Sequence, residues 1–359
     1  MAKKFLILTA GYGEGHNSAA RGLQAALARV APDASVELHD LFAETYAALH
    51  HWVRKGYLGL INSWPRSWGF VYRWLDRKSD FHADFRRFAR LRRTLEVLLA
   101  RFQPEVVVSV FPAYPYLIES LTKNGAPRSV AIVTDSITVN AIWYRSEADC
   151  FILPNDQSAD VLRRAGIAES RIKVFGFPVD PGFADLARRD PPSSQNRPRV
   201  LYMINAATGR AAETARRLSE LDVQLTVTVG RDEKLRREIE AAVTAKAVEI
   251  IGWCSNLPEL LCRSHLLIGK AGGATVQEAI AAACPMLINH IVSGQEEGNA
   301  QLLMENGGGL IVRGPSAIAQ TVSDLFANDS ARWRQMSVAI GKISRPAAAF
   351  DIANYLLSL

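Results

Sequence analysis

Residues 269–299 read GKAGGATVQEAIAAACPMLINHIVSGQEEGN. This stretch runs from an apolar strand into a glycine turn, a short helix, a second apolar strand and a polar loop. Glycines at a strand-to-helix turn let backbone N–H groups approach a phosphate, and the partial positive charge of the helix start favours an anion. The polar loop adds hydrogen-bonding side chains. The stretch therefore predicts a ligand with a phosphate end and a hydroxylated end.

A second interpretation of the same residues needs no ligand. Thr275 and Glu278 have the S/T-x-x-E spacing of a capping box, which stabilises a helix start by itself. The spacing leaves open whether Glu278 caps a helix, contacts a ligand or does both.

The composition indicates a globular protein of two domains. A chain of 359 residues exceeds what one core usually supports, and 48% hydrophobic with 22% charged residues is ordinary for a folded protein. Four widely spaced cysteines show no metal-ligand or C-x-x-C spacing, so we expect buried, reduced thiols of a cytosolic protein. They are Cys150, Cys254, Cys262 and Cys284.

The apolar runs predict where the protein is located. The run before Gly11 is too short for a signal peptide, and no run approaches the roughly 20 residues that a membrane-spanning helix needs. We therefore expect a cytoplasmic protein that is peripherally associated with the inner face of the cell membrane.

Strands alternate with helical stretches along the chain, which favours mostly parallel sheets covered on both faces. We expect strands at 4–10, 36–40, 105–111, 129–135, 150–154, 199–205, 223–229, 248–253, 265–270, 285–290 and 309–313. The proline-rich segment 190–199 predicts a linker. The expected parts are an acceptor and membrane-facing domain (1–190), a donor-binding domain (199–345) and a final helical segment (346–359). The sequence leaves open whether this last segment packs back on the first domain.

Two loops are candidates for the binding site. Ligands of open α/β sheets bind beyond the carboxyl ends of the strands, so 11–16 and 269–273 should face a cleft between the two domains. Residues 10–23 read AGYGEGHNSAARGL and lack both the Walker ending and the G-x-G-x-x-G spacing, which disfavours an NTPase or a dinucleotide enzyme.

His16 is the candidate base in the first loop. An imidazole with a pKa near 6.5 can accept a proton at neutral pH, and the dipole of the helix start disfavours its cationic form. The alternative is a structural histidine in the first turn of a helix.

Three blocks together resemble a known family. They are GYGEGHNSAARGLQAAL (11–27), VTDSITVNAIWYRSEADCFILPNDQSADVLRRAGIAESRIKVFGFPV (133–179) and GKAGGATVQEAIAAACPMLINHIVSGQEEGNAQLL (269–303). The chain resembles the monogalactosyldiacylglycerol synthases and the processive diacylglycerol glucosyltransferases, and more distantly the peptidoglycan N-acetylglucosaminyltransferase. The resemblance implies two Rossmann-like domains facing across a cleft (the GT-B architecture), a UDP-sugar donor, inversion at the anomeric carbon and no cofactor.

The resemblance also implies roles for particular residues. His16 is the expected base, Gly272, Gly273 and Thr275 hold the diphosphate, and Glu278 holds the ribose. The remaining donor-binding residues are Gly252, Trp253, Lys270, Gln295, Glu296 and Asn299, with the backbone at Gly252 and Trp253 facing uracil. The acceptor-side residues are Gly13, Gly15, Asn17, Asp135 and Asn140.

The chain departs from the family pattern in two places. Asn140 stands where members commonly carry a histidine, and an amide cannot act as a base near neutral pH. Residues 206–208 replace glycines that often follow this strand in related enzymes. No D-x-D sequence occurs, so we expect no metal at the diphosphate, and Lys270 with backbone amides offsets its charge.

A basic, aromatic segment predicts a membrane-facing surface. Residues 51–101 hold twelve Lys or Arg against four acids, together with four of the seven tryptophans. Trp at headgroup level and basic side chains on anionic lipid favour peripheral docking, whereas a solvated basic face with core tryptophans is the alternative. No nucleic-acid module accompanies the segment, so we expect no nucleic-acid partner. The membrane-facing candidates are Trp52, Trp64, Trp68, Arg73 and Trp74.

The leading hypothesis is transfer of a hexose from a UDP-sugar to a lipid hydroxyl, with diacylglycerol as the first candidate acceptor. The alternatives are a UDP-sugar 2-epimerase of the same architecture and a nucleotide-sugar-binding protein without catalysis.

Overall fold

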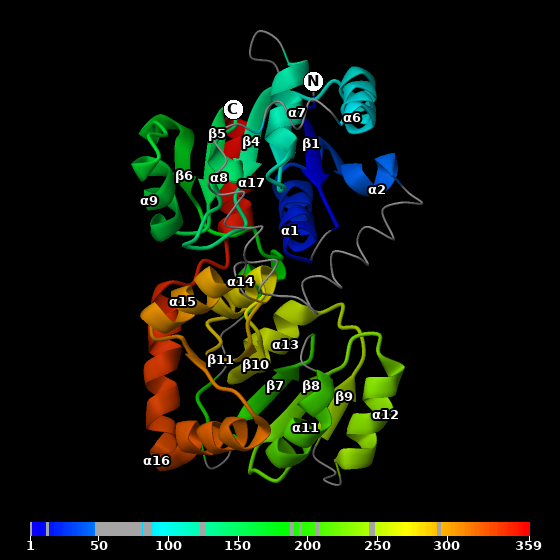
Figure 1. Cartoon of the computed structure of the whole chain (residues 1–359). Coiled ribbons are helices and arrows are strands. Elements are labelled where there is room, and N and C mark those ends of the chain that lie inside the picture. Colours follow the sequence, from blue (N-terminus) through cyan, green and yellow to red (C-terminus); the bar gives the residue numbers. More distant parts are fainter. Residues whose placement is uncertain are drawn as a thin grey trace. The chain divides into compact units, whose positions relative to one another are not determined.

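The computed structural model describes residues 2–11, 14–46, 81, 88–122, 127–186, 190–193, 196–205, 208–243, 248–292 and 296–359. These residues form two compact α/β units. Unit 1 comprises Met1–Pro181, Val292–Gly298 and Ala347–Leu359, and unit 2 comprises Gly182–Ile291 and Asn299–Pro346. Figure 1 shows the strands of each unit side by side with helices packed around them.

Unit 1 is built on a six-stranded parallel sheet in the order β2-β1-β3-β4-β5-β6. The strands are β1 (Lys4–Thr9), β2 (Ser35–Asp40), β3 (Val106–Ser109), β4 (Arg128–Ile132), β5 (Cys150–Leu153) and β6 (Ile172–Val174). The central strands are buried except at the first residues of β1 and β4, as expected for a parallel sheet with both faces covered.

Helices cover the sheet of unit 1. They are α1 (Glu14–Val30), α2 (Leu41–Thr45), α6 (Ala89–Phe102), α7 (Tyr114–Leu121), α8 (Ala141–Tyr144), α9 (Asp156–Arg164), the 3-10 helix η1 (Glu169–Arg171) and α17 (Ala348–Ser358). Helix α17, red in Figure 1, is the last element of the chain and packs against α1.

Unit 2 is also built on a six-stranded parallel sheet, in the order β12-β11-β10-β7-β8-β9. Its strands are β7 (Arg199–Met203), β8 (Gln224–Thr228), β9 (Val248–Ile251), β10 (Leu266–Lys270), β11 (Met286–His290) and β12 (Gly309–Ile311). The two sheets confirm the predicted α/β fold with parallel strands.

Most helices of unit 2 follow these strands, and α10 precedes β7. The helices are α10 (Gly182–Asp185), η2 (Thr208–Arg210), α11 (Ala211–Ser219), α12 (Glu233–Ala242), α13 (Leu257–Arg263), α14 (Gly273–Ala281), α15 (Glu297–Glu305) and α16 (Pro315–Lys342). The backbone of α16 leaves the helical conformation at 327–330, where three consecutive residues have positive φ.

The expected linker at 190–199 is anchored to unit 2. The His265 imidazole is fully buried, its Nδ1 accepts a hydrogen bond from Arg199 N, and its Nε2 lies 2.8 Å from Asp190 O. An imidazole that accepts at one nitrogen and donates at the other satisfies both contacts. The boundary between the two units falls after Pro181, before the proline-rich segment and not within it.

The cysteines differ from the expectation at one position. Cys150, Cys262 and Cys284 are buried, whereas Cys254 is half-buried. All four are free thiols. Cys254 follows β9 at the edge of the sheet, where fewer neighbours are available to cover it.

Helix α1 packs closely on unit 1 because its inner face carries small side chains. Ala19, Ala20 and Ala26 are completely buried on this face. Gly22 also lies there, and a Cβ at this position would stand 2.1 Å from Pro178 O and 2.7 Å from Val179 O. Helix α1 therefore approaches the backbone at 178–179 so closely that any side chain at position 22 would collide with it.

We expect Gly22→Ala to lower the free energy of unfolding by about 3 kcal/mol, because an overpacked helix must shift away from a backbone that cannot yield. Urea unfolding monitored by circular dichroism measures the change. Gly209→Ala is the matched control, since no atom lies within 4 Å of the position that its Cβ would take. Equal stability of the two variants would contradict the close approach.

Candidate active site

The first candidate site lies where the strand order of unit 1 reverses. Strand β1 pairs with both β2 and β3, so the loops after β1 and β3 leave this point on opposite sides of the sheet. Such a switch point is where open α/β sheets bind ligands. His16 belongs to the first turn of α1, after β1, and Phe111 follows β3.

Side chains from two loops and from helix α8 surround the His16 ring. Its Nδ1 lies 3.1 Å from Thr134 Oγ1, and the hydroxyl can donate to or accept from either tautomer. The Phe111 ring stands edge-on with its centroid 5.3 Å away, and Trp143 lies at 6.2 Å. The ring is thus fixed between two aromatic side chains and one hydroxyl.

Burial lowers the pKa of His16 from 6.5 to about 4, and a hydrogen bond with the Val110 backbone opposes the shift only in part. Desolvation disfavours the cation because water no longer stabilises its charge. The helix dipole also disfavours the cation, but burial is the largest cause of the lowered pKa. The imidazole is neutral at pH 7 and able to accept a proton.

Asp135 and Trp143 form a direct contact beside this ring. Trp143 Nε1 donates to Asp135 Oδ2 at 2.9 Å, and the indole is 1% exposed. Asn140 is also buried, and its Oδ1 accepts a hydrogen bond from Ile142 N at 3.1 Å as the N-cap of α8. In this chain the residue that replaces the family's histidine stabilises a helix start.

Two further contacts fix the loop that precedes His16. Thr9 Oγ1 donates to Asn17 Oδ1 at 2.9 Å, and Gly11 N donates to Asp40 Oδ2 at 2.8 Å. Asn17 therefore lies beside the end of β1. Gly15 is in the first turn of α1, while Gly13 lies outside the described residues.

The sequence analysis missed Asp40 and Thr134 as site residues. Each follows or ends a predicted strand at the carboxyl edge of the sheet, at VELHD and SVAIVTD. This position was the available signal, since polar residues at that edge face the ligand site of a parallel sheet.

The second candidate site lies at the corresponding point of unit 2. The strand order reverses between β7 and β10, and the glycine turn follows β10. Gly272 is the N-cap of α14 and Gly273 is its first residue, so free backbone N–H groups point away from the helix here. The Lys270 ammonium and the Thr275 hydroxyl both lie 3.6 Å from the position of a Cβ on Gly272. A cation, a hydroxyl and a helix start therefore converge.

The structure does not contain the capping box that the sequence allowed. Helix α14 begins at Gly273, which places Thr275 inside its first turn and Glu278 in the second turn. The N-cap Gly272 receives no side-chain hydrogen bond. Gly272, whose backbone is extended, is the N-cap of α14 in place of Thr275.

Asn299 holds the glycine turn from a neighbouring helix. Its Nδ2 donates to Ala271 O at 3.2 Å, and its buried Oδ1 has no hydrogen-bond partner. Asn299 is 5% exposed. The amide thus orients the backbone immediately before Gly272.

Glu296 has a local contact in unit 1. Its carboxylate accepts a hydrogen bond from Val292 N at 2.8 Å, and its own amide donates to Val292 O. The side chain is 5% exposed. This pair closes the polar loop, and Gln295 lies outside the described residues.

Gly252 and Trp253 follow β9 at the opposite edge of the sheet from β12. Trp253 is 60% exposed, and the Arg231 guanidinium lies 4.9 Å from its ring centroid. Two strands separate β9 from β10, which corresponds to about 14 Å between their axes. An extended ligand is needed to reach both the glycine turn and this tryptophan.

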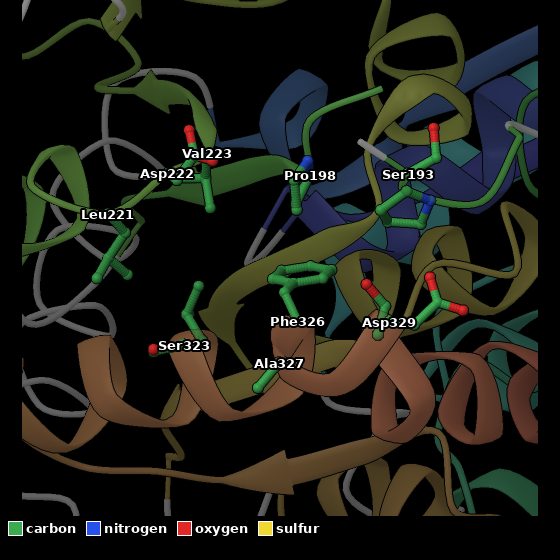
Figure 2. A pocket seen from close by; sticks show the side chains of 12 residues that line it. Ser193, Pro198, Leu221, Asp222, Val223, Ser323, Phe326, Ala327 and Asp329 are labelled. Carbon is green, nitrogen blue, oxygen red and sulfur yellow. The ribbon is translucent and has the colours of Figure 1, made fainter. Parts of the chain in front are cut away.

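A hollow also lies elsewhere in unit 2. It has a volume of about 420 Å³ and is lined by residues that precede β7 and β8 and by helix α16. Figure 2 shows Phe326 and Ser323 on one side and Leu221 and Asp222 on the other. It opens at the amino ends of the strands, opposite the glycine turn, so the hollow is separate from the candidate site.

The membrane-facing candidates Trp52, Trp64, Trp68, Arg73 and Trp74 lie outside the described residues. Helix α6 is the described part of the basic segment. Leu91, Leu95 and Leu98 are buried on its inner face, and Arg90, Arg92 and Arg93 are exposed. Phe88 and Val97 are also exposed. Throughout the described ranges, no helix combines the length and the apolar character needed to cross a bilayer.

Across the part of the chain that the structure describes, His, Cys, Asp and Glu form no group of three that could bind a metal ion.

We expect His16 to lower the stability of the protein in acid. The unfolded chain binds a proton near pH 6.5 and the folded chain only near pH 4, so between these values the unfolded state binds more protons. The free energy of unfolding should fall as the pH drops through this window, with a contribution from His16 of at most about 3 kcal/mol.

Urea midpoints at pH 7 and pH 4.5 check this expectation, and His16→Gln should lose less stability between them than the wild type. His290→Gln, which removes a half-buried imidazole from unit 2, is the control. The same pH dependence in wild type and His16→Gln would contradict the burial of the ring.

Two protein-family models match the chain, one in each half. Residues 16–179 match the model "Monogalactosyldiacylglycerol (MGDG) synthase", and residues 201–349 match "Glycosyltransferase family 28 C-terminal domain". The monogalactosyldiacylglycerol synthase of Spinacia oleracea is 28% identical over 99% of this chain and 72% of its own length. A probable synthase of Glycine max is 27% identical over 99% and 71%.

These relatives correct the expected location. Both are described as chloroplastic, so the expectation of a cytoplasmic protein at the inner face of the cell membrane is wrong. That expectation depended on the lack of a long apolar run, and an organelle address does not require such a run.

Solved structures share the fold. The MurG of Acinetobacter baumannii has a TM-score of 0.60 and 13% identity, and covers 99% of this chain and 100% of its own. The UDP-GlcNAc 2-epimerase of Neisseria meningitidis has a TM-score of 0.62 and 12% identity, with coverage of 99% and 100%. These similarities confirm the GT-B architecture. Over its two halves the chain is therefore similar to the monogalactosyldiacylglycerol synthases and to the C-terminal domain of glycosyltransferase family 28, which supports a glycosyltransferase.

Proposed function

We propose that the protein is an inverting glycosyltransferase that moves a hexose from a UDP-sugar to a lipid hydroxyl, with diacylglycerol as the leading acceptor. The observation that carries the proposal is the neutral His16 imidazole at the switch point of unit 1, inside the region that matches the synthase family. The relatives are named for a galactosylated diacylglycerol, which favours this acceptor.

In the proposed reaction, the acceptor hydroxyl attacks the anomeric carbon of the donor sugar. The bond from that carbon to the diphosphate oxygen breaks, UDP leaves with the electron pair, and the hydroxyl proton passes to His16. Attack opposite the leaving group inverts the anomeric carbon. The contact of 3.1 Å between Thr134 Oγ1 and the imidazole supports this role, because a general base must lie at such a distance from the hydroxyl that it deprotonates.

The glycine turn of unit 2 supports a nucleoside diphosphate as the leaving group. The start of α14 supplies backbone N–H groups, Lys270 supplies a positive charge, and Thr275 supplies a hydroxyl. Such groups stabilise the charge that develops when UDP departs. Trp253 offers an exposed aromatic face for the base at the other end of an extended nucleotide.

A membrane surface is the natural source of the acceptor. The outer face of α6 presents arginines beside exposed Phe88 and Val97. Basic side chains are attracted to anionic lipid, and apolar ones insert among the headgroups. We propose that this face binds the membrane that carries the acceptor lipid.

We expect UDP release from a UDP-sugar to depend on added diacylglycerol, and His16→Ala to lower turnover at least a hundredfold while UDP affinity changes less than threefold. The reason is that the imidazole removes the hydroxyl proton but does not contact the donor nucleotide. A panel of UDP-sugars, with product identification by mass, measures the reaction.

His39→Ala is the matched control, since this histidine lies on the edge strand β2 and its imidazole hydrogen-bonds to the surface carboxylates of Glu37 and Glu44. Sugar epimerisation without acceptor would identify a 2-epimerase instead. UDP-sugar binding without turnover on any acceptor would identify a binding protein, and full activity of His16→Ala would exclude His16 as the base.

We expect the triple variant Arg90→Gln, Arg92→Gln and Arg93→Gln to bind anionic vesicles at least tenfold more weakly, because each basic side chain near the surface contributes roughly 1 kcal/mol. Vesicle co-sedimentation measures the affinity. The control removes three arginines from α11 and α12 of unit 2, namely Arg216, Arg217 and Arg237. Equal loss in both variants would assign the effect to net charge and not to α6.

A further inference from the structure

A strained turn lies between the residues that surround His16. Ile137 has a φ of +59°, although its β-branched side chain disfavours this conformation. Thr138 N donates to Ser136 O at 2.6 Å, which closes a three-residue turn around Ile137. A γ-turn with positive φ at its centre is rare and strained. Backbone in this state persists only when its surroundings hold it there.

Ser158 holds this turn from helix α9. Its Oγ accepts a hydrogen bond from Ile137 N at 3.0 Å and lies 3.5 Å from Asp135 O, to which it can donate. The residue is completely buried. Its own backbone amide is fixed by Asn155 Oδ1, the N-cap of α9, at 2.8 Å. One rigidly placed hydroxyl thus contacts the backbone on both sides of Ser136.

The backbone that Ser158 contacts, residues 135–137, lies next to the groups that face His16. Thr134, two residues before Ser136, contacts the imidazole directly. Asp135 orients Trp143, whose ring lies 6.2 Å from that of His16. A change in the turn would therefore move the hydroxyl and the indole that enclose the imidazole.

We propose that Ser158 is a positioning residue for the catalytic loop: its hydroxyl holds the strained turn at Ile137 and thereby keeps Thr134 and Trp143 against His16. The catalytic part of this statement rests on the proposed transferase function. The structural part concerns the loop alone and can be tested without any substrate.

The first test is the variant Ser158→Ala. Without the hydroxyl, Ile137 N has no acceptor and the turn relaxes, so water reaches the His16 ring. The pKa of His16, followed by NMR and assigned with His16→Gln, should rise by one unit or more from about 4. In the transferase assay kcat should fall about tenfold, while KM for the UDP-sugar stays within twofold.

Ser129→Ala is the matched control. Ser129 is a buried serine on β4 of the same unit, and its Oγ has no hydrogen-bond partner. Its removal should leave the His16 pKa and kcat unchanged. An unchanged His16 pKa in folded Ser158→Ala would overturn the proposal, whether or not the protein proves to be a transferase.

The second test asks whether strain is what Ser158 opposes. Glycine adopts positive φ without steric cost, so adding Ile137→Gly to Ser158→Ala should return the His16 pKa and kcat most of the way to the wild type. A double variant as impaired as Ser158→Ala alone would overturn the strain argument. If Ser158→Ala does not fold, hydrogen exchange of the Ile137 amide in the wild type decides: protection supports the contact, and rapid exchange excludes it.

Discussion

The candidate site depends on one topological constraint, the reversal of strand order within each parallel sheet. Between β1 and β3, and again between β7 and β10, successive connections leave on opposite sides of the sheet. The space left at the carboxyl ends cannot be filled by a crossover helix, so it is available to a ligand. His16 and Gly272 occupy the loops at these two points, although their loops share no sequence motif. One constraint therefore accounts for both the candidate base and the candidate phosphate turn.

Much of the fold and part of the site could be predicted from the sequence. The buried strands were predictable because continuous apolar runs of parallel strands contrast with the charged helices between them. His16 and Gly272 were predictable as candidate site residues because glycines after a strand indicate close approach of the backbone to a ligand. Strand β6 was missed, since three residues carry too little periodicity to be recognised. Helix α16 and its break at 327–330 were not predicted from the sequence.

The remaining site contacts could not be predicted because they depend on tertiary structure. Thr134 and Ser158 are ordinary polar residues in the sequence, and only the folded loop brings them to His16 and Ile137. The capping box at Thr275 was wrong because local spacing does not fix where a helix begins. Asn140 could be recognised as a departure from the family, but its role as a helix cap required the structure.

The position of α17 has a consequence for synthesis of the chain. This helix buries Ala348, Ile352 and Leu356 completely, packs on α1, and its Leu357 carbonyl accepts a hydrogen bond from Lys3. Unit 1 therefore combines β1 with α17, a helix that is synthesised after the whole of unit 2. Because domains usually fold in order of their synthesis, unit 2 can complete its core while unit 1 still lacks α17. A nascent chain of this protein exposes the apolar face of α1 until α17 has been synthesised, which is the interval in which a chaperone would bind it.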